Sequence, residues 1–346
     1  MRRTALRPVL AAWLALAALL AATCAQAQAP EKKAVTIAVG GKAALYYLPL
    51  SLAERLGYFK DAGLDVQILD FPGGAKSLQA MMGGSADVVA GGFDHVVILR
   101  ARGQKLQAFV LQVATPSLML GVLKARAAGY RSPEDLKGMK VGVTAPGSST
   151  HIFLNHLLAG AGLSPDDVAV IGVGTGPTAV AAVRAGHIDA IVNVEPAIAM
   201  LERAGAIVVV TETASEQGSR AQFGEALPAG SLYTKEEFLK RNPNTAQALV
   251  NAMVRALLWL EQASPQEILK AVPAEYALGE PDTYLAALAR QRQGYSRDGL
   301  IPPAGAAALH RVLRRFDPSV QQARDLDITQ AYDNRFAEQA LRRYRK

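Results

Sequence analysis

Cysteine is almost absent from this sequence, and charged residues are scarce. The 346 residues include a single cysteine, Cys24, so no internal disulfide can form. If the segment that carries Cys24 is removed, no thiol remains for catalysis. Charged residues make up only 19% of the chain and hydrophobic residues 50%, a balance that indicates a globular protein and excludes a disordered one.

The sequence also lacks a concentrated basic patch. The formal net charge of +7 includes three arginines near the start of the chain, Arg2, Arg3 and Arg7. Arginines cluster elsewhere only at residues 311–315 and 342–345, on expected helix faces. We therefore expect no nucleic-acid partner.

Only one long apolar run is present, at residues 9–22. It follows the three arginines and precedes a small-residue cleavage site at residues 25–27, a pattern typical of a secretory signal peptide over residues 1–27. The run is too short to span a bilayer comfortably. Lipid attachment at Cys24 is not expected, because residues 21–23 lack the leucine and the small residue that usually precede such a cysteine. The sequence predicts an exported, soluble protein of the periplasm.

The rest of the chain alternates short apolar strands with helical periodicity, in two successive series. The expected strands are residues 34–40, 64–70, 87–91 and 106–113, and then 118–123, 139–144, 168–173, 188–194 and 206–211. Each series predicts a mostly parallel sheet covered by helices, hence an α/β fold. We expect one lobe from residues 34–115 and 228–346 and a second lobe from residues 116–227.

Sequences of the form Ser/Thr-x-x-Asp/Glu mark where helices begin. Such capping boxes are expected at Ser132, Ser164, Thr234 and Ser264, three of them with proline at the first helical position. The polar, glycine-containing residues 214–228 are expected to form a connection between the lobes. From Thr234 onward, the pattern predicts almost continuous helix.

A run of hydroxyl side chains follows one expected strand. Ser148, Ser149 and Thr150 fall in the first turn of an apolar-periodic helix, after a break at residues 145–147. The first turn of a helix has unpaired N–H groups and carries the positive end of the helix dipole, so hydroxyls there can form a receptor for a small anion. The same residues also fit an ordinary serine N-cap, and this stretch alone leaves both interpretations open.

Other motifs fit poorly. The glycine-rich residues 172–177 have their third glycine one residue too early for a dinucleotide-binding turn, so we interpret Thr175 and Gly176 as a close backbone approach to a ligand. His151 and His156 are five residues apart and lie on different sides of a helix, which argues against a zinc site. We expect no cofactor, no metal and no catalytic residue.

Four stretches together resemble one family. They are AERLGYFKDAGLDVQI at 53–68, GGSADV at 83–88, DLKGMKVGV at 135–143 and AVRAGHIDAIV at 182–192. They are similar to nitrate/sulfonate/taurine-type solute-binding proteins, a family that includes binders of thiamine pyrimidine precursors. The resemblance implies a type II periplasmic binding fold, with two doubly wound α/β lobes around a ligand cleft and a helical C-terminal extension. It also implies a monomer that delivers a small organic anion to an ABC permease and its ATPase.

Carried over to this sequence, the resemblance assigns the cleft to loops that follow the strands. The run of hydroxyl side chains in this sequence resembles the group that binds the anionic head of the ligand in sulfonate and nitrate relatives. The candidate ligand-binding residues, with the two from the glycine-rich turn, are Tyr46, Tyr47, Phe93, Asp94, His95, Thr115, Ser117, Ser148, Ser149, Thr150, Thr175, Gly176 and Glu195.

Three of these candidates do not suit a simple anion site. Asp94 and Glu195 would repel an anion unless the ligand also carries a cation or N–H donors, as an amino-sulfonate or an aminopyrimidine does. His95 either donates to an anion or caps a helix. Some relatives with this fold are enzymes that make the thiamine pyrimidine from their own histidine and pyridoxal phosphate. The signal peptide, and Lys42 as the only lysine near the expected cleft, favour a binding protein.

Overall fold

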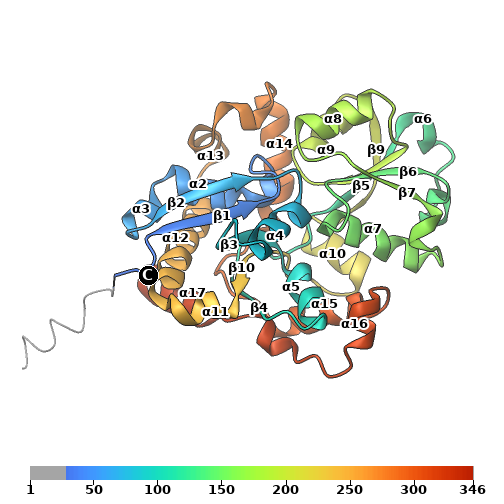
Figure 1. The fold of residues 1–346 in the computed structure, drawn as a ribbon. Helices are drawn as coiled ribbons and strands as arrows, with labels where there is room; N and C mark the ends of the chain where they lie inside the picture. Colours follow the sequence, from blue (N-terminus) through green and yellow to red (C-terminus); the bar gives the residue numbers. More distant parts are fainter. Residues whose placement is uncertain (1–28, 346) are drawn as a thin grey trace, which may run out of the picture.

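The computed structural model describes residues 29–345, so the expected signal peptide and Cys24 lie outside the described residues. The chain forms two five-stranded sheets that lie side by side, each flanked by helices (Figure 1). We call the half that contains the first strand lobe 1 and the other half lobe 2. This two-lobed α/β arrangement agrees with the fold class predicted from the sequence.

The sheet of lobe 1 consists of β1 (Ala34–Val39), β2 (Asp65–Asp70), β3 (Val88–Gly92), β4 (Leu106–Leu111) and β10 (Gly230–Lys235). Its strand order is β2-β1-β3-β10-β4. β1 is parallel to β2 and β3, whereas β10 is antiparallel to both of its neighbours. The consecutive residues Ile37, Ala38 and Val39 have no exposed surface, because helices cover both faces of the sheet.

The sheet of lobe 2 consists of β5 (Met119–Leu123), β6 (Lys140–Val143), β7 (Ala169–Gly172), β8 (Ala190–Asn193) and β9 (Ile207–Glu212). Its strand order is β7-β6-β8-β5-β9, with β6 parallel to β7 and β8, and β5 antiparallel to β8 and β9. The two sheets therefore share one pattern. In each, the antiparallel strand is the first one after the chain has crossed from the other lobe.

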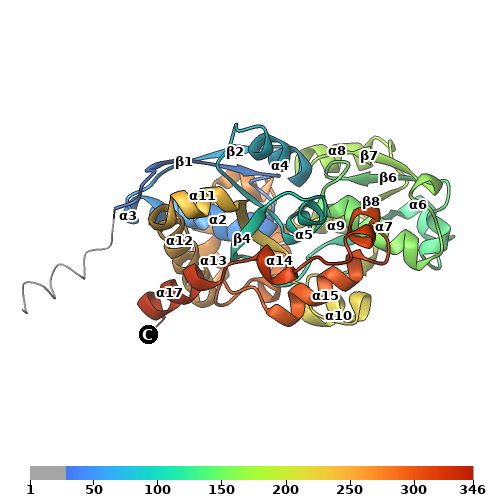
Figure 2. The same cartoon turned by 60° about the horizontal axis from the view of Figure 1, so that its bottom comes forward.

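Helices surround both sheets, and the C-terminal helices pack mainly on lobe 1 (Figures 1 and 2). The longest, α12, buries Leu249, Met253 and Ala256 completely and packs along α2, α3 and α17. The helices are α2 (Leu48–Arg55), α3 (Tyr58–Asp61), α4 (Gly74–Met82), α5 (Phe93–Ala101), α6 (Lys124–Ala127), α7 (Ser149–Gly160), α8 (Pro177–Arg184), α9 (Ala197–Arg203), α10 (Glu216–Phe223), α11 (Glu236–Arg241), α12 (Pro243–Gln262), α13 (Pro265–Ala271), α14 (Pro281–Gln291), α15 (Pro303–Leu313), α16 (Pro318–Gln322) and α17 (Arg335–Tyr344).

Six short 3-10 helices complete the described elements. They are η1 (Leu45–Tyr47), η2 (Pro133–Leu136), η3 (Pro165–Asp167), η4 (Ala274–Ala277), η5 (Arg292–Gly294) and η6 (Ile328–Ala331). Three of the predicted capping boxes are confirmed, at Ser132, Ser164 and Ser264. The fourth prediction is wrong, because Thr234 lies within β10 and α11 begins only at Glu236.

The return from lobe 2 to lobe 1 differs from the prediction. Residues 214–228 are more than a connection, because α10 forms within them. The strand β10 that follows was not predicted, although Leu232 and Tyr233 are completely buried in the middle of the sheet. Its antiparallel direction also makes the sheet more mixed than the repeated strand–helix rhythm suggests.

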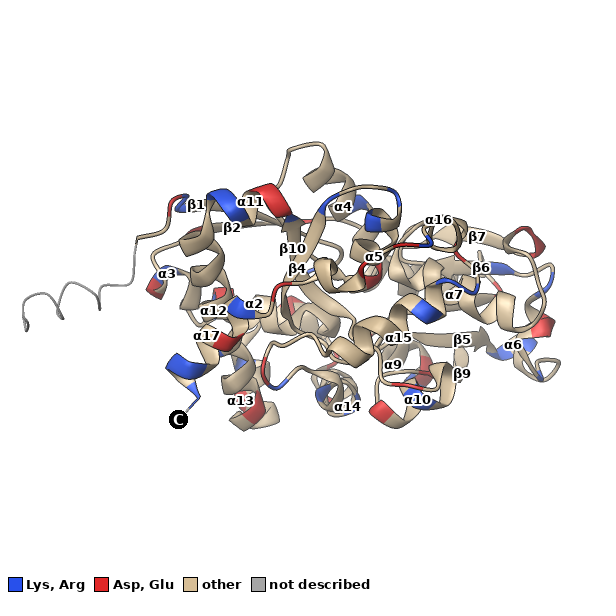
Figure 3. Cartoon of the chain, turned by 90° about the horizontal axis from the view of Figure 1, so that it is seen from below, with Lys and Arg blue, Asp and Glu red and all other residues tan. Residues whose placement is uncertain are grey.

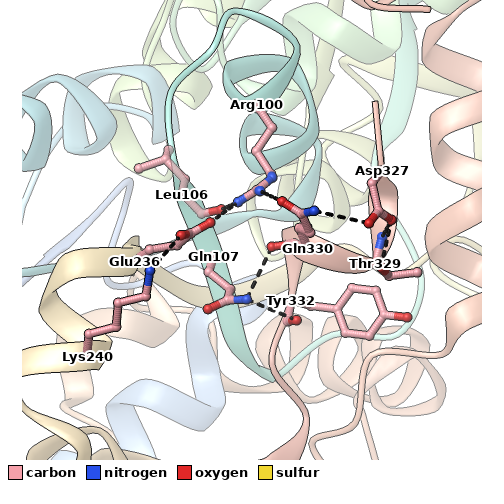
Figure 4. Close-up of polar contacts among 9 residues, drawn as sticks. All are labelled: Arg100, Leu106, Gln107, Glu236, Lys240, Asp327, Thr329, Gln330 and Tyr332. Atoms are coloured by element: carbon pink, nitrogen blue, oxygen red, sulfur yellow. Dashed lines mark hydrogen bonds and ion pairs between the residues drawn. The ribbon is translucent and has the colours of Figure 1, made fainter. Parts of the chain in front are cut away.

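A polar network ties the C-terminal segment to lobe 1 (Figure 4). The guanidinium of Arg100, on α5, donates to Leu106 O at 2.7 Å, to Glu236 Oε1 at 2.6 Å and to Gln330 Oε1 at 2.9 Å. Gln107 donates from β4 to the carbonyl oxygens of Gln330 and Tyr332. Three segments that are far apart in sequence are thereby joined at one edge of the sheet.

Charged side chains are distributed over both lobes. In the view of Figure 3, basic and acidic residues are interspersed along the helices and do not collect on one element. No helix within residues 29–345 is both long enough and apolar enough to cross a membrane.

Candidate functional site

The loops that follow several strands meet between the two lobes. Parallel sheets bind ligands at the carboxyl ends of their strands, and here the carboxyl ends of both sheets contribute to one region. Leu45 N, after β1, donates to Glu195 O, after β8, at 2.9 Å. The lobes are therefore in direct backbone contact beside this region.

A cavity lined by several hydroxyl-bearing residues lies at this meeting point. The space between its walls, including the open mouth, is about 330 Å³. A Cβ on Gly40 would lie 2.3 Å from Gly74 N, so glycine at position 40 lets the start of α4 approach the end of β1 and form one wall. The lining residues are Gly40, Tyr46, Tyr47, Gly74, Leu118, Thr144, Ser148, Ser149, Thr150, Thr175 and Val194.

The N-termini of α4 and α7 both reach this cavity, one from each lobe. Ser148 occupies the N-cap position of α7, but its side chain makes no capping hydrogen bond to its own helix. Instead, Ser148 Oγ accepts a hydrogen bond from Ala75 N in the first turn of α4, at 3.0 Å. The serine thus joins two helix N-termini, where unpaired N–H groups and helix dipoles favour negative charge.

The other two hydroxyls of the turn have different partners. Ser149 Oγ donates to Asp94 Oδ1 at 2.9 Å, a third contact between the lobes. Thr150 Oγ1 accepts from Thr144 N at 3.0 Å and lies 2.8 Å from Thr144 Oγ1. Ser149 can exchange its contact with Asp94 for one to a ligand. Thr150 lines the cavity and also holds the shape of the loop through Thr144.

Tyr46 and Tyr47 form an aromatic wall of the cavity. Their rings meet edge to face, with centroids 5.0 Å apart, and their side chains are almost fully buried. Within residues 29–345, neither hydroxyl has a hydrogen-bond partner. Burial raises the pKa of both hydroxyls, so at neutral pH they are protonated and able to donate. Two neutral donors therefore border the polar space.

The acidic and basic candidates lie outside this lining. Glu195 is completely buried, and its carboxylate accepts from Ala199 N at 2.9 Å and pairs with Arg290 at 3.1 Å. Burial raises the pKa of the Glu195 carboxyl above its usual range, an effect that Arg290 and the Ala199 N–H oppose. His95 Nδ1 lies 3.2 Å from Tyr233 Oη and His95 Nε2 lies 3.2 Å from Gly147 O, and the latter is a fourth contact between the lobes.

The remaining candidates have surroundings of their own. Phe93 has no exposed surface and packs edge to face on Tyr332 in the core of lobe 1. Thr115 and Ser117 are buried in the crossing between the lobes, where Thr115 donates to Ala214 O and Ser117 accepts from Gln291. The backbone of Gly176 has a φ of 57° at the N-cap of α8, and the residue does not line the cavity.

The lining gathers six of the predicted residues: Tyr46, Tyr47, Ser148, Ser149, Thr150 and Thr175. Sequence reasoning missed Gly40, Gly74, Leu118, Thr144 and Val194. For Gly40 and Gly74, the signal available in the sequence was a glycine directly after a strand or at the start of a helix. The apolar Leu118 directly precedes the buried strand β5 and Val194 directly follows β8, and nothing in their sequence context distinguishes them.

The cavity offers hydrogen-bond donors without charge. As described within residues 29–345, its lining contains no lysine, arginine, aspartate or glutamate. The same residues include no group of three or more His, Cys, Asp or Glu placed to hold a metal ion. This arrangement suits reversible binding of a polar or anionic group.

Two α/β lobes, with a polar cavity between them and direct contacts across it, define a two-lobed ligand-binding fold. The chain belongs to the NMT1/THI5-like family, whose sequence profile matches residues 44–268. A solved structure from Bordetella bronchiseptica RB50 is 49% identical, covers 92% of this chain and 100% of its own, and superposes with a TM-score of 0.90. The alkanesulfonate-binding protein SsuA from Xanthomonas axonopodis pv. citri, bound to MOPS, shares the fold at 20% identity and a TM-score of 0.70, over 88% of this chain and 99% of its own.

Curated relatives are more distant. The binding protein YtlA of Bacillus subtilis is 23% identical over 74% of this chain and 76% of its own length. The nitrate/nitrite-binding protein NrtA of a Nostoc species is 24% identical over 71% of this chain and 59% of its own. The 4-amino-5-hydroxymethyl-2-methylpyrimidine phosphate synthase THI13 of Saccharomyces cerevisiae is 25% identical over 61% of this chain and 62% of its own.

Proposed function

We propose that this protein is the extracytoplasmic solute-binding component of an ABC importer and that it captures a small organic anion between its lobes. The observation that carries the proposal is the cavity where α4 and α7 begin, which is lined by hydroxyls and, among the residues that the structure describes, by no charged side chain. Neutral donors can hold an anion firmly enough to bind it, without a permanent ion pair that would slow its release. Relatives named for binding nitrate and alkanesulfonate support an oxyanion as the ligand.

Both lobes contribute to ligand capture in this proposal. Ser148, Ser149 and Thr150 belong to lobe 2, whereas Tyr46 and Tyr47 belong to lobe 1. A ligand that bonds to both sets stabilises the arrangement in which the lobes touch, and that arrangement is the form delivered to the permease. We assign residues 34–115 and 228–346 to lobe 1 and residues 116–227 to lobe 2.

The proposal extends to the surroundings of the protein. We infer that it works as a monomer in the periplasm, after removal of residues 1–27 and without a lipid at Cys24. Its partners would be a permease and an ATPase at the inner membrane. No nucleic acid takes part in this function.

An aminopyrimidine is the second candidate ligand. Asp94 lies beside the cavity and already accepts from Ser149, so it can also accept from a ligand amino group. Relatives named as pyrimidine phosphate synthases give this candidate its support. We do not propose synthase activity here, because Lys42 pairs with Glu54 and the cavity lining described within residues 29–345 contains neither lysine nor histidine.

Calorimetric titration of residues 28–346 tests the proposal. The panel contains methanesulfonate, taurine, benzenesulfonate, nitrate, benzoate and an aminopyrimidine. We expect binding of at least one anion, weakened roughly tenfold or more in the double variant Ser148→Ala with Thr150→Ala, since each lost bond to a charged group costs about 1.5–3 kcal/mol. Ser164→Ala with Thr329→Ala is the control, because both hydroxyls lie in solvent-exposed turns. Unchanged affinity in the first variant would move the site elsewhere.

A further inference from the structure

A second cavity adjoins the polar one. Tyr46, Leu118 and Ser149 line both cavities and form their shared wall. The space between the walls of the second cavity, including its mouth, is about 460 Å³. The two spaces are thus neighbouring compartments between the same two lobes.

The walls of the second cavity are mainly apolar and come from both lobes. Ile152 and Phe153 on α7, with Phe223 on α10, belong to lobe 2. Leu313 on α15 and the following Phe316 belong to the C-terminal part of lobe 1. α10 and α15 lie next to each other in both Figure 1 and Figure 2. An apolar group in this space is therefore enclosed by helices of both lobes.

Aromatic rings dominate one side of this space. The ring centroid of His156 lies 4.7 Å from that of Phe223 and 6.0 Å from that of Phe316, and Phe153 lies 5.9 Å from Phe223. His156 Nε2 lies 3.2 Å from Gln222 Nε2. Burial lowers the pKa of His156, so near neutral pH its ring is an uncharged aromatic surface. Such clusters favour another ring, packed on a face or against an edge.

The two compartments differ in the side chains that line them. The polar compartment has hydroxyls and helix N-termini. Polar side chains in the apolar compartment are few and include His156, Asp94, which lines this compartment alone, and Ser149, which lines both. Asp94 Oδ1 is already occupied by bonds from Ser149 Oγ and His95 N. A ligand that reaches both compartments needs a compact polar head and a bulky apolar body.

We propose that the ligand is an aryl anion, an aromatic ring bearing a sulfonate or carboxylate, with its head in the polar compartment and its ring in the apolar one. This inference rests on the proposed function and narrows its substrate class. Nitrate or taurine would leave the apolar walls unused, whereas burial of a ring removes apolar surface of both partners from water. The ring also joins α7 and α10 to α15, so it contributes to holding the lobes together.

Matched pairs of ligands test the inference by calorimetry on residues 28–346. Benzenesulfonate is compared with methanesulfonate, and benzoate with acetate; taurine and neutral benzyl alcohol complete the set. We expect each aryl anion to bind at least tenfold more tightly than its methyl counterpart, than taurine and than benzyl alcohol. Equal affinity for methanesulfonate or taurine would overturn the aryl inference and leave the proposed function intact. Equal affinity for benzyl alcohol would overturn the inference by removing the role of the head. If no anion binds, the proposed function itself fails.

Two variants locate the ring. Phe223→Ala and Phe316→Ala each remove one partly buried ring from the apolar compartment. We expect each to weaken aryl anions about fivefold or more, and to leave the polar-head contacts used by methanesulfonate unchanged. Phe336→Ala is the matched control, since this partly buried ring packs on Phe109 in lobe 1, away from both cavities. Equal losses in Phe336→Ala, or no loss in the first two variants, would contradict the assignment.

Discussion

Glu195 is a carboxylate in a position with no exposed surface. Its two oxygens are directed to Ala199 N and to Arg290, and Arg290 also pairs with the exposed Glu202. Because burial outweighs these partners, the pKa of Glu195 is raised in the folded protein. The carboxylate therefore reduces stability at neutral pH while it joins lobe 2 to α14.

Replacing Glu195 with glutamine should make stability less sensitive to pH. A carboxyl whose folded-state pKa is raised binds more protons in the folded state, so its contribution is present below the unfolded pKa near 4.5 and is lost as pH rises through the folded value. We expect the melting temperature of Glu195→Gln, relative to the unmodified protein, to be higher at pH 7.5 than at pH 4.

Thermal unfolding at several pH values measures this difference. Glu202→Gln is the control, because its side chain is 41% exposed and pairs with the same arginine. A difference that stays constant with pH, or that grows in acid, would contradict the raised pKa.

Some residues of this site could be predicted from the sequence, whereas their hydrogen-bond partners could not. The hydroxyls of Ser148 and Ser149 were recognisable because they follow a strand and open a helix. Their partners were not, because Ala75 and Asp94 are distant in sequence and are brought near only when the lobes meet. The pairing of Glu195 with Arg290 was also out of reach, since a sequence gives no information on whether a carboxylate is directed into a cavity or toward an arginine.

At the scale of elements, the strands β5 and β10 have the same place in the two sheets, each just after a crossing. The sequence predicted β5, because residues 118–123 form a continuous apolar run. It did not predict β10, whose GSLYTK sequence mixes polar and apolar residues although all but Lys235 are buried. Thr234 gives the reason, because its hydroxyl donates to Asp87 O at 2.6 Å and so becomes acceptable inside the sheet. Local pattern predicts strands that are apolar throughout, and tertiary hydrogen bonds create the others.

The network around Arg100 should matter for stability (Figure 4). Arg100 is 8% exposed and Glu236 is 17% exposed, so Arg100→Met leaves Glu236, Leu106 O and Gln330 without their common donor. We expect a loss of about 2–4 kcal/mol in the free energy of unfolding. Chemical denaturation measures it, with Arg220→Met as the control in an exposed pair with Glu216 that is worth less than about 0.5 kcal/mol. Similar losses in both variants would show that burial adds nothing to the Arg100 network.

At the scale of the whole molecule, four of the contacts that join the lobes within residues 29–345 lie around the cavity. They are the hydrogen bonds Leu45 N to Glu195 O, Ala75 N to Ser148 Oγ and Ser149 Oγ to Asp94 Oδ1, and the contact of His95 with Gly147 O. Several of these groups also line the cavity or stand next to it. A ligand therefore competes with contacts that the protein makes between its own lobes. The measured free energy of binding is the difference between the contacts that the ligand forms and the contacts that it displaces.

Those contacts also control timing. A solute that displaces these contacts can bind fully only after the lobes have separated. The observed rate of binding should therefore level off at high solute concentration, at the rate of lobe separation, rather than rise in proportion. His95→Phe keeps a ring but removes the contact with Gly147, and we expect it to raise that plateau about two- to tenfold. Stopped-flow fluorescence measures the plateau rate of the unmodified protein and that of the variant. An observed rate that keeps rising in proportion to solute concentration would mean that the entrance is always open. If the rate levels off, uptake of a scarce solute depends on how often the lobes separate as much as on how tightly the protein holds the solute.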